Sequence, residues 1–332
     1  MTLSSAAQAV PAYRDAGVGG VGIQLLEGPK NREKDPRAHR YIVDHLAPGT
    51  TIRRKLGVVN SSAKRQHVTV YPGPATLKQG KFVFDSDGDG DELTSWISLD
   101  KGELNLQPGA KAVVEATVAV PRAASAGERY GVIWASVGSA APPSGGVRMA
   151  TRTGVRLYLD IGLGGEPRSD FTIHELTTAR SPAGDPSLAV TVTNTGGRAL
   201  DITGSADLPE GPAGQRAGPF QVTSTVTLGL DATGAVIVQF PRALPNGPWK
   251  VELTLRSGLI KRAVTAMITF PDPGKADRRG TFMSKLTGPW ILTGGSLLTG
   301  LIVFVLVLLI RRRRRHRHRP RHYRQRKSRE AA

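Results

Sequence analysis

Apolar and polar residues alternate with a period of two through much of residues 20–271. The alternation is clearest at 155–161 and 249–256, and it recurs at 112–120. This period places one face of each strand in a core and the other face in water, which is typical of antiparallel sheets. Clusters of Gly, Pro, Asn and Asp separate the strands, and no amphipathic helix pattern precedes residue 290. The pattern therefore predicts an all-β fold of two immunoglobulin-like β-sandwich modules in tandem, followed by one transmembrane α-helix.

An internal repeat supports two modules. Each copy has an Asn at the end of a strand and, further along, a Gly six positions after a Pro that closes another strand. The second copy is shorter, and we expect the extra length of the first copy to include the acidic stretch near residues 85–92. The repeated residues are Asn60, Pro121 and Gly127 in the first copy and Asn194, Pro241 and Gly247 in the second.

The organisation that we expect has six parts. The two modules are separated by a Gly- and Pro-bearing linker near residues 162–168, and a short polar stalk follows the second module. The parts are a signal-peptide remnant and flexible leader at 1–20, the first module at 21–163, the second module at 168–271, the stalk at 272–289, the transmembrane helix at 290–310, and a polybasic cytoplasmic tail at 311–332.

The membrane segment is a run of 21 residues without a charge, Trp290–Ile310. At 1.5 Å per residue it spans about 31 Å, close to the hydrocarbon thickness of a bilayer. Small residues in it, such as Gly295 and Thr299, leave open a dimer of such helices. Arg311–Arg315 follow directly, and positive charge beside a spanning helix stays cytoplasmic. The sequence therefore predicts a single-pass plasma-membrane protein whose N-terminus is extracellular.

This orientation requires an export signal, and Ala7-Gln8-Ala9 has the small-x-small pattern of a signal-peptide cleavage site. We therefore expect residues 1–9 to be the end of a longer signal peptide. The alternative is a tail-anchored protein that faces the cytoplasm, which would have to move the basic tail across the membrane.

Composition excludes several classes of site and partner. The chain has no Cys, so disulfide scaffolds, cysteine zinc sites, iron–sulfur clusters and cysteine nucleophiles are excluded. The formal net charge of +18 would suit nucleic acid, but 12 of the 45 Lys and Arg lie in the last 22 residues, beside a single Glu. Such a tail next to a membrane helix is typical of an anchor on anionic lipid. We expect no nucleic-acid partner.

Two stretches resemble a known family. AHRYIVDHLAPGTTIRRKLGVVNSS, followed by LQPGAKAVVEATVAVPRAASAGERYGVIWA, resembles the N-terminal domain of the WxL-interacting protein family of Gram-positive bacteria. The second module, with VTVTNTGG and LPNGPWKVELTLRSG, is similar more loosely to the companion domain of that family. The resemblance implies immunoglobulin-like modules, a first module that binds peptidoglycan and a second that contacts a protein. It supplies no binding-residue motif.

The acidic stretch Asp85–Glu92 is the most notable polar cluster. Asp85, Asp87, Asp89 and Gly90 match positions 1, 3, 5 and 6 of a calcium loop, but Trp96 stands where the bidentate Glu should be. The stretch therefore indicates either a weak calcium site or, as we favour, a solvated acidic hairpin.

The remaining motifs are weaker indications of function. The GxGxxG string at 17–22 precedes a strand rather than following one, so it does not match the dinucleotide-binding fingerprint. We expect it to belong to the flexible leader. Asp44-His45 would need a converging Ser to act as a triad. No histidine pair has metal-ligand spacing; the ectodomain histidines are His39, His45, His67 and His174.

The alternation also predicts which aromatic residues are buried. Trp134 and Trp249 lie on alternating strands and are expected in the core, whereas Trp96 and Tyr71-Pro72 are candidates for surface or edge positions.

The sequence assigns no catalytic, cofactor-binding or metal-binding residue, and no cofactor. It predicts a non-catalytic cell-surface protein that binds peptidoglycan, another cell-wall polymer or a surface protein. The alternatives are an assembly protein that accepts a strand from a secreted partner and, less favoured, a cell-wall glycan enzyme.

Overall fold

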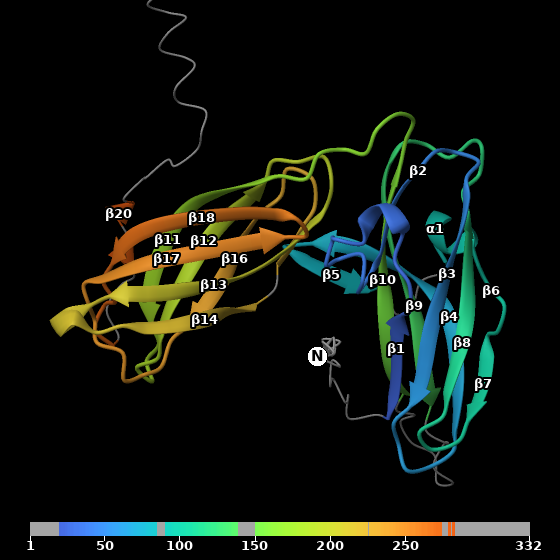
Figure 1. Cartoon of the computed structure of the whole chain (residues 1–332), viewed down its shortest axis with the longest axis horizontal. Coiled ribbons are helices and arrows are strands. Elements are labelled where there is room, and N and C mark those ends of the chain that lie inside the picture. The colour runs from blue at the N-terminus through green and yellow to red at the C-terminus, as the bar shows by residue number, and fades with distance from the viewer. Residues whose placement is uncertain are drawn as a thin grey trace, which may run out of the picture. The chain divides into compact units, whose positions relative to one another are not determined.

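The computed structural model describes residues 20–84, 90–138, 150–224 and 226–273, together with the backbone of 278–279 and 281–282 (Figure 1). Strands dominate these residues, which confirms the predicted all-β class. No helix in the described part of the chain has the length and hydropathy needed to cross a membrane. The predicted membrane segment, 290–310, lies outside the described residues, as do the tail, most of the leader and the stalk, and Asp85–Asp89.

Two sheets form the first sandwich. One has the strand order β1-β3-β8-β6, and the other has the order β2-β10-β9-β4-β5, with β7 also paired to β4. Apolar side chains from both sheets share one core, which includes Leu56, Val114, Ile133 and Leu157. The strands are β1 (Val21–Leu25), β2 (Ile42–Leu46), β3 (Thr51–Asn60), β4 (Gln66–Lys78), β5 (Lys81–Phe84), β6 (Ile97–Leu99), β7 (Glu103–Leu106), β8 (Lys111–Ala119), β9 (Gly127–Gly138) and β10 (Ala150–Ile161).

The second group of strands shares a separate core, which includes Phe171, Val190, Trp249 and Leu253. Its sheet has the order β19-β11-β12-β16-β14-β13-β17-β18-β20, and β15 pairs with β13. Its strands are β11 (Phe171–Arg180), β12 (Pro186–Asn194), β13 (Leu200–Glu210), β14 (Ala217–Ser224), β15 (Val226–Leu228), β16 (Thr233–Gln239), β17 (Trp249–Ser257), β18 (Ile260–Ile268), β19 (Arg278–Arg279) and β20 (Thr281–Phe282).

The N-terminal strand of the first sandwich changes sheets. β1 pairs antiparallel with β3, and after the loop that contains a 3₁₀ turn, η1 (Lys30–Arg32), β2 pairs parallel with β10. β2 pairs only with Leu157–Ile161, the second half of β10. The switch therefore leaves the first half of β10 without a strand partner from β2.

The internal repeat corresponds to repeated structure. Asn60 and Asn194 are both fully buried, and each side-chain amide donates to backbone carbonyls, among them those of Leu106 at the end of β7 and Leu228 at the end of β15. Each backbone N–H donates across the fold, to the carbonyls of Ala110 and Ala232 respectively. The buried amides are satisfied because two carbonyls converge on that of Asn60 and three on that of Asn194, so each Asn fixes the end of its strand.

The repeated glycines also share a conformation. Gly127 has φ = +125° and Gly247 has φ = +118°, a region that residues with a Cβ rarely adopt. In both copies the turn before the glycine is closed by a hydrogen bond to the carbonyl of the repeated proline, from Ala124 N–H to Pro121 and from Leu244 N–H to Pro241. The spacing of six residues thus marks the same turn twice.

Candidate functional site

The two sandwiches meet over an aromatic surface of the first one. Phe82, Tyr130 and Tyr158 lie on the face of the β5–β4–β9–β10 sheet that points away from the first core, with ring centroids 5.2 Å apart for Phe82–Tyr158 and 6.0 Å for Tyr130–Tyr158. Ala199, just before β13, is buried among them. At the tip of the β4–β5 hairpin, the Gly80 carbonyl accepts a hydrogen bond from the Thr227 N–H of β15. The contact between the sandwiches therefore has its own small apolar core.

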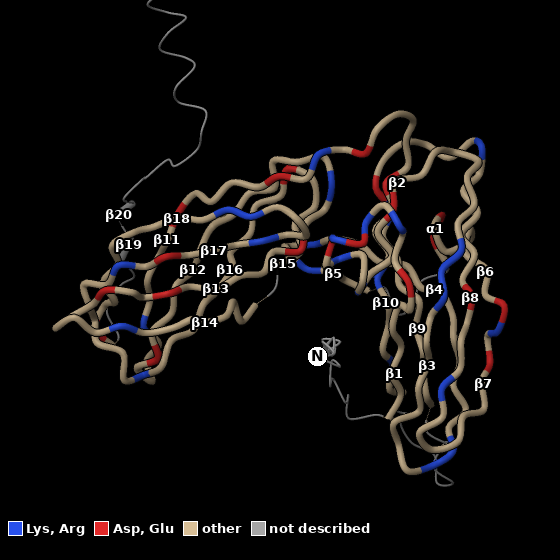
Figure 2. The backbone as a smooth tube through the Cα atoms, in the orientation of Figure 1, with Lys and Arg blue, Asp and Glu red and all other residues tan. Residues whose placement is uncertain are grey.

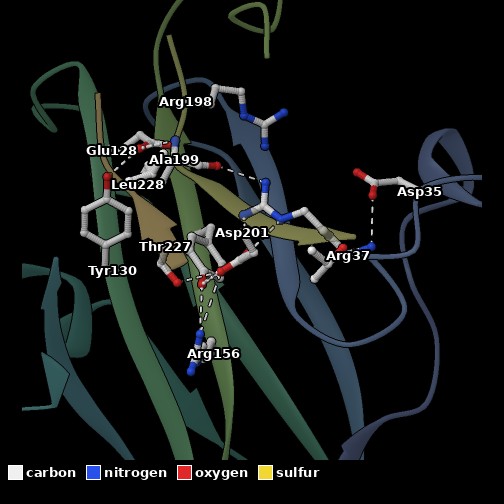
Figure 3. Close-up of polar contacts among 12 residues, drawn as sticks. Asp35, Arg37, Glu128, Tyr130, Arg156, Arg198, Ala199, Asp201, Thr227 and Leu228 are labelled. Atoms are coloured by element: carbon white, nitrogen blue, oxygen red, sulfur yellow. Dashed lines mark hydrogen bonds and ion pairs between the residues drawn. The ribbon is translucent and has the colours of Figure 1, made fainter. Parts of the chain in front are cut away.

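Asp201 on β13 is the centre of the polar contacts in Figure 3. Arg37 donates from Nε to its Oδ2 at 2.9 Å, and Tyr158 donates its hydroxyl to Oδ1 at 2.9 Å. Thr227 donates to Oδ1 at 2.8 Å from within the second sandwich, and Arg156 lies 3.8 Å away. This buried carboxylate thus joins the two sandwiches, because its donors come from both.

Glu128 makes a second connection. Its carboxylate accepts the Ala199 N–H with both oxygens, at 2.8 and 2.9 Å, and it also accepts the hydroxyl of Tyr130. Burial raises the pKa of Glu128, and these two hydrogen bonds oppose the shift. The backbone N–H of Ala199, which would otherwise be buried without a partner, is satisfied by the other sandwich.

Three arginines line a cavity of about 210 Å³ beside these contacts. Arg32 and Arg37 come from the loop between β1 and β2, and Arg198 comes from the turn before β13. Glu166, in the segment between β10 and β11, forms ion pairs with Arg32 at 2.6 Å and with Arg198. Burial and, after it, the nearby charges of Arg32 and Arg37 together lower the pKa of Arg198 to about 10. We call these four residues the arginine cavity.

A different feature is the exposed side of β10. Ala150–Arg156 pair with β9 on one side, and among the described residues no strand pairs with them on the other. β1 runs close to β10 but forms its ladder with β3. We call Ala150–Arg156 the open edge. Its backbone N–H and C=O groups on that side are available to another strand.

The outer face of the open edge is basic and aromatic. The guanidinium of Arg152 lies 4.5 Å from the centroid of Trp134, and that of Arg156 lies 4.8 Å from the centroid of Phe82. Arg152 is exposed, whereas Arg156 is half-buried. Figure 2 shows that charges of both signs are spread over both sandwiches, so this pair of arginines is not part of a uniformly basic surface.

The edges at β4 and β18 have features that limit pairing with a further strand. On the side away from β9, β4 pairs with β7 near its start and with β5 near its end. The open part between these two pairings contains Pro72 and Pro74, which have no N–H to donate. β18 carries Lys261 and Arg262 at its exposed start, and its end pairs with β20. Proline within an edge, and an edge already partly covered by another strand, both limit pairing with a further strand.

The acidic stretch is only partly described, so the favoured solvated hairpin and the alternative of a weak calcium site both stay predictions. Asp91 caps a short helix, α1 (Glu92–Ser95), by accepting the Thr94 N–H at 2.8 Å, and Glu92 pairs with Arg129 at 2.8 Å. Among the described residues no group of three or more His, Cys, Asp or Glu is placed to hold a metal ion.

The Asp44-His45 pair does not form a catalytic dyad. Both carboxylate oxygens of Asp44 accept hydrogen bonds from Arg54 at 2.7 Å, whereas His45 Nδ1 lies 2.6 Å from Asp160. His45 Nε2 faces the carbonyl of Gly164 at 3.2 Å, where a triad would need a serine hydroxyl. The other histidines are apart from one another: His39 contacts the Glu33 carbonyl, His67 contacts Glu103, and His174 is exposed on β11.

The aromatic predictions have mixed outcomes. Trp249 is buried in the second core, as predicted, and Trp134 is buried too, but on the outer face of the first sandwich against Phe84 and Arg152. Trp96 is buried in the first core, so its surface assignment was wrong. The reason is α1, which turns the chain inward and makes Trp96 its C-terminal cap. Tyr71 and Pro72 are half-buried and pair with β9, at Trp134 and Ile133.

The arginine cavity and Asp201 were not found from the sequence, since their residues belong to no alternating pattern.

No protein-family model matches the chain, and no curated protein matches it. Solved structures that resemble it include a chain of the complex between the SafA pilin and the SafB chaperone of Salmonella enterica, at 8% identity and a TM-score of 0.39, covering 74% of this chain and 96% of that one. The CupB2 chaperone of Pseudomonas aeruginosa has 10% identity and a TM-score of 0.34, covering 68% and 96%. A family 123 glycoside hydrolase of Clostridium perfringens has 11% identity and a TM-score of 0.28, covering 42% and 27%. TM-scores this low carry no conclusion about what this chain binds.

Proposed function

We propose that this chain is a non-catalytic binding protein that takes an extended segment of a secreted or surface protein as an added strand on the open edge of β10. The observation that carries the proposal is the register of β2, which covers Leu157–Ile161 and stops there. The backbone groups of Ala150–Arg156 then have a strand partner on one side only among the described residues. Main-chain hydrogen bonds along such an edge supply affinity, and side chains at alternate positions supply specificity.

The open edge differs from the open part of β4 in a way that supports pairing. It contains no proline, whereas the open part of β4 contains Pro72 and Pro74. Its neighbour β1 lies close by, so an incoming segment would find β1 beside the edge as well. Arg152 and Arg156 are four positions apart on one face of β10, which favours a segment with two acidic residues four positions apart.

The finer architecture forms part of this proposal. We infer that both modules are immunoglobulin-like, since the first one switches its N-terminal strand between two sheets and both repeat the buried Asn and the glycine turn. We also propose the extracellular orientation and the membrane helix at 290–310 on sequence grounds. Membership of the WxL-interacting family and peptidoglycan binding stay predictions from the resemblance, and a pull-down with insoluble peptidoglycan tests them separately.

Peptides with methylated backbone nitrogens test the added strand. Phage-displayed random 12-residue peptides are selected on the full chain, and the best binder is then synthesised with one N-methyl group at each position in turn. In a β-strand, successive N–H groups point to opposite sides. We therefore expect a loss of affinity of about tenfold or more at every second position and small changes between them. Equal affinity for all the methylated peptides would overturn the proposal.

Proline substitutions locate the binding edge. The N–H groups of Arg152 and Thr153 point to opposite sides of β10, so one of the two faces β9 and the other faces the open side. A proline whose nitrogen faces β9 removes a hydrogen bond of the sheet and lowers the thermal midpoint. Whichever of Arg152→Pro and Thr153→Pro keeps the wild-type midpoint therefore has its proline on the open side. That variant should lose the selected peptide. Lys261→Pro on β18 serves as the control and should retain it.

A further inference from the structure

The arginine cavity contains donors that the protein does not use. Arg198 has a side-chain exposure of 4%, and its Nε has no hydrogen-bond partner. The hydroxyl of Ser257, at the end of β17, is also buried without a hydrogen-bond partner and lines the same cavity. Buried donors without partners are rare in folded proteins because each costs free energy. Two of them around one cavity indicate a missing acceptor.

The charge of the cavity lining points to the kind of acceptor. Three guanidinium groups line it, from Arg32, Arg37 and Arg198, against the carboxylates of Asp35 and Glu166. Arg37 directs its Nε to Asp201, outside this lining. Burial lowers the pKa of Arg198 most, and repulsion from Arg32 and Arg37 adds to the shift. An anion in the cavity would relieve that repulsion.

Glu166 shows that the arginines can hold an oxyanion. It belongs to the segment between the two sandwiches, its side chain is 37% exposed, and it bridges Arg32 of one sandwich to Arg198 of the other. A carboxylate between two guanidinium groups is the contact that an external carboxylate or phosphate would make. Because Glu166 reaches the cavity from a partly exposed position, an external oxyanion can compete with it.

We propose that this cavity binds an oxyanion, as a carboxylate or phosphate group, through Arg32, Arg198 and the Ser257 hydroxyl, in exchange for the Glu166 carboxylate. The cavity of about 210 Å³ has room for a small group of this kind. Phosphate and carboxylate share the recognition by guanidinium and hydroxyl donors, and a test with both distinguishes them. The inference is independent of the added strand on β10.

A titration of the full chain tests the site. Sodium phosphate and sodium acetate are each added at constant ionic strength, with sodium chloride as the balancing salt. The Nε–Hε signal of Arg198 is followed by ¹⁵N NMR and assigned by its loss in Arg198→Lys. We expect a saturable shift of this signal with at least one of the two anions. Whichever anion binds more tightly identifies the chemical class of the ligand.

Neutralising the resident carboxylate should strengthen binding. In Glu166→Gln the anion no longer competes with a charged side chain, so its affinity should rise about tenfold. The matched control is Asp185→Asn, which neutralises an acid in an exposed pair with Arg242 and should leave the affinity unchanged. Ser257→Ala removes only a hydroxyl, so it should fold and should bind the anion several-fold more weakly.

Two results would overturn the inference. One is the absence of a saturable Arg198 shift with both anions in the wild type and in Glu166→Gln. The other is an equal response of Glu166→Gln and Asp185→Asn, which would mean that the anions act only through general screening. Thermal unfolding of each variant without added anion shows whether a lost response reflects a lost fold.

Discussion

At the scale of single residues, buried polar groups carry much of the specificity of this fold. Asn60 and Asn194 have no exposed surface, and each holds two or more backbone carbonyls with its amide. The repeat of Asn at the ends of two strands was visible in the sequence because both follow an alternating run. Which carbonyls they hold could not be predicted, because Leu106 and Leu228 lie 46 and 34 residues away.

Removing either amide should destabilise its sandwich. Asn60→Ala and Asn194→Ala each leave buried carbonyls without a donor, so we expect each to lower the free energy of unfolding by about 1–3 kcal/mol. Urea unfolding monitored by circular dichroism measures this. Asn105→Ala, on the exposed face of β7, is the control and should change stability by no more than about 0.5 kcal/mol. A loss of the same size in Asn105→Ala would contradict the account of the buried amides.

Glu128 should make stability depend on pH. Burial raises its pKa above the ordinary value of 4.5, so the folded state binds this proton more tightly than the unfolded state. At a pH above the raised pKa of the folded state, the proton adds no stability. Its contribution grows as the pH falls through that pKa, and it is complete below the pKa that Glu128 has in the unfolded state.

The measurement is the difference in free energy of unfolding between wild type and Glu128→Gln, which cannot titrate at this position. As the pH falls from neutral toward 4.5, the difference should move in favour of the wild type, by at most about 1.4 kcal/mol per pH unit. A difference that is constant with pH, or that moves in favour of the variant, would show that the pKa of Glu128 is not raised.

At the scale of secondary-structure elements, the strands were the most predictable part. Their alternation comes from burial of one face, which is a local property, so 112–120, 155–161 and 249–256 were all read as strands, and they fall within or overlap β8, β10 and β17. α1 was missed because a single helical turn has no periodicity to detect. Its only sequence mark is Asp91, three residues before Thr94, and the acidic run around it suggested a loop.

The cap of α1 offers a local test. Asp91→Ala removes the acceptor of the Thr94 N–H, which should cost about 1 kcal/mol and loosen the turn that buries Trp96. The fluorescence of Trp96, isolated by replacing the other tryptophans with phenylalanine, should shift to longer wavelength. Asp91→Asn keeps the cap and should leave both stability and emission nearly unchanged. Identical spectra for the Ala and Asn variants would argue against this role.

At the scale of the whole molecule, the contact between the sandwiches was beyond the reach of the sequence. Arg37 and Asp201 are 164 residues apart, and neither belongs to a motif. The same holds for Glu128 and Ala199, which are 71 residues apart. Long-range pairs of this kind depend on how two separately folded surfaces meet, and one sequence contains no direct record of that contact. The open edge was foreseen only as a general alternative, and its position depends on where β2 stops.

Asp201 is expected to couple the two sandwiches. Asp201→Asn leaves the buried guanidinium of Arg37 without its charged partner, so it should lower the free energy of unfolding by about 3 kcal/mol. It should also separate the unfolding of the two sandwiches, seen by calorimetry as two transitions in place of one. Asp185→Asn, in an exposed pair, should retain the wild-type profile. A single unshifted transition in Asp201→Asn would contradict this coupling.

The most direct test of the proposed function is amide hydrogen exchange across β10. Exchange is measured by mass spectrometry on the full chain, with and without the selected 12-residue peptide. The account predicts that the peptide slows exchange at Ala150–Arg156, leaves the amides of β18 unchanged, and has no effect when it is N-methylated at alternate positions on the pairing side. Protection elsewhere with none at Ala150–Arg156 would show that the open edge is not where this protein binds.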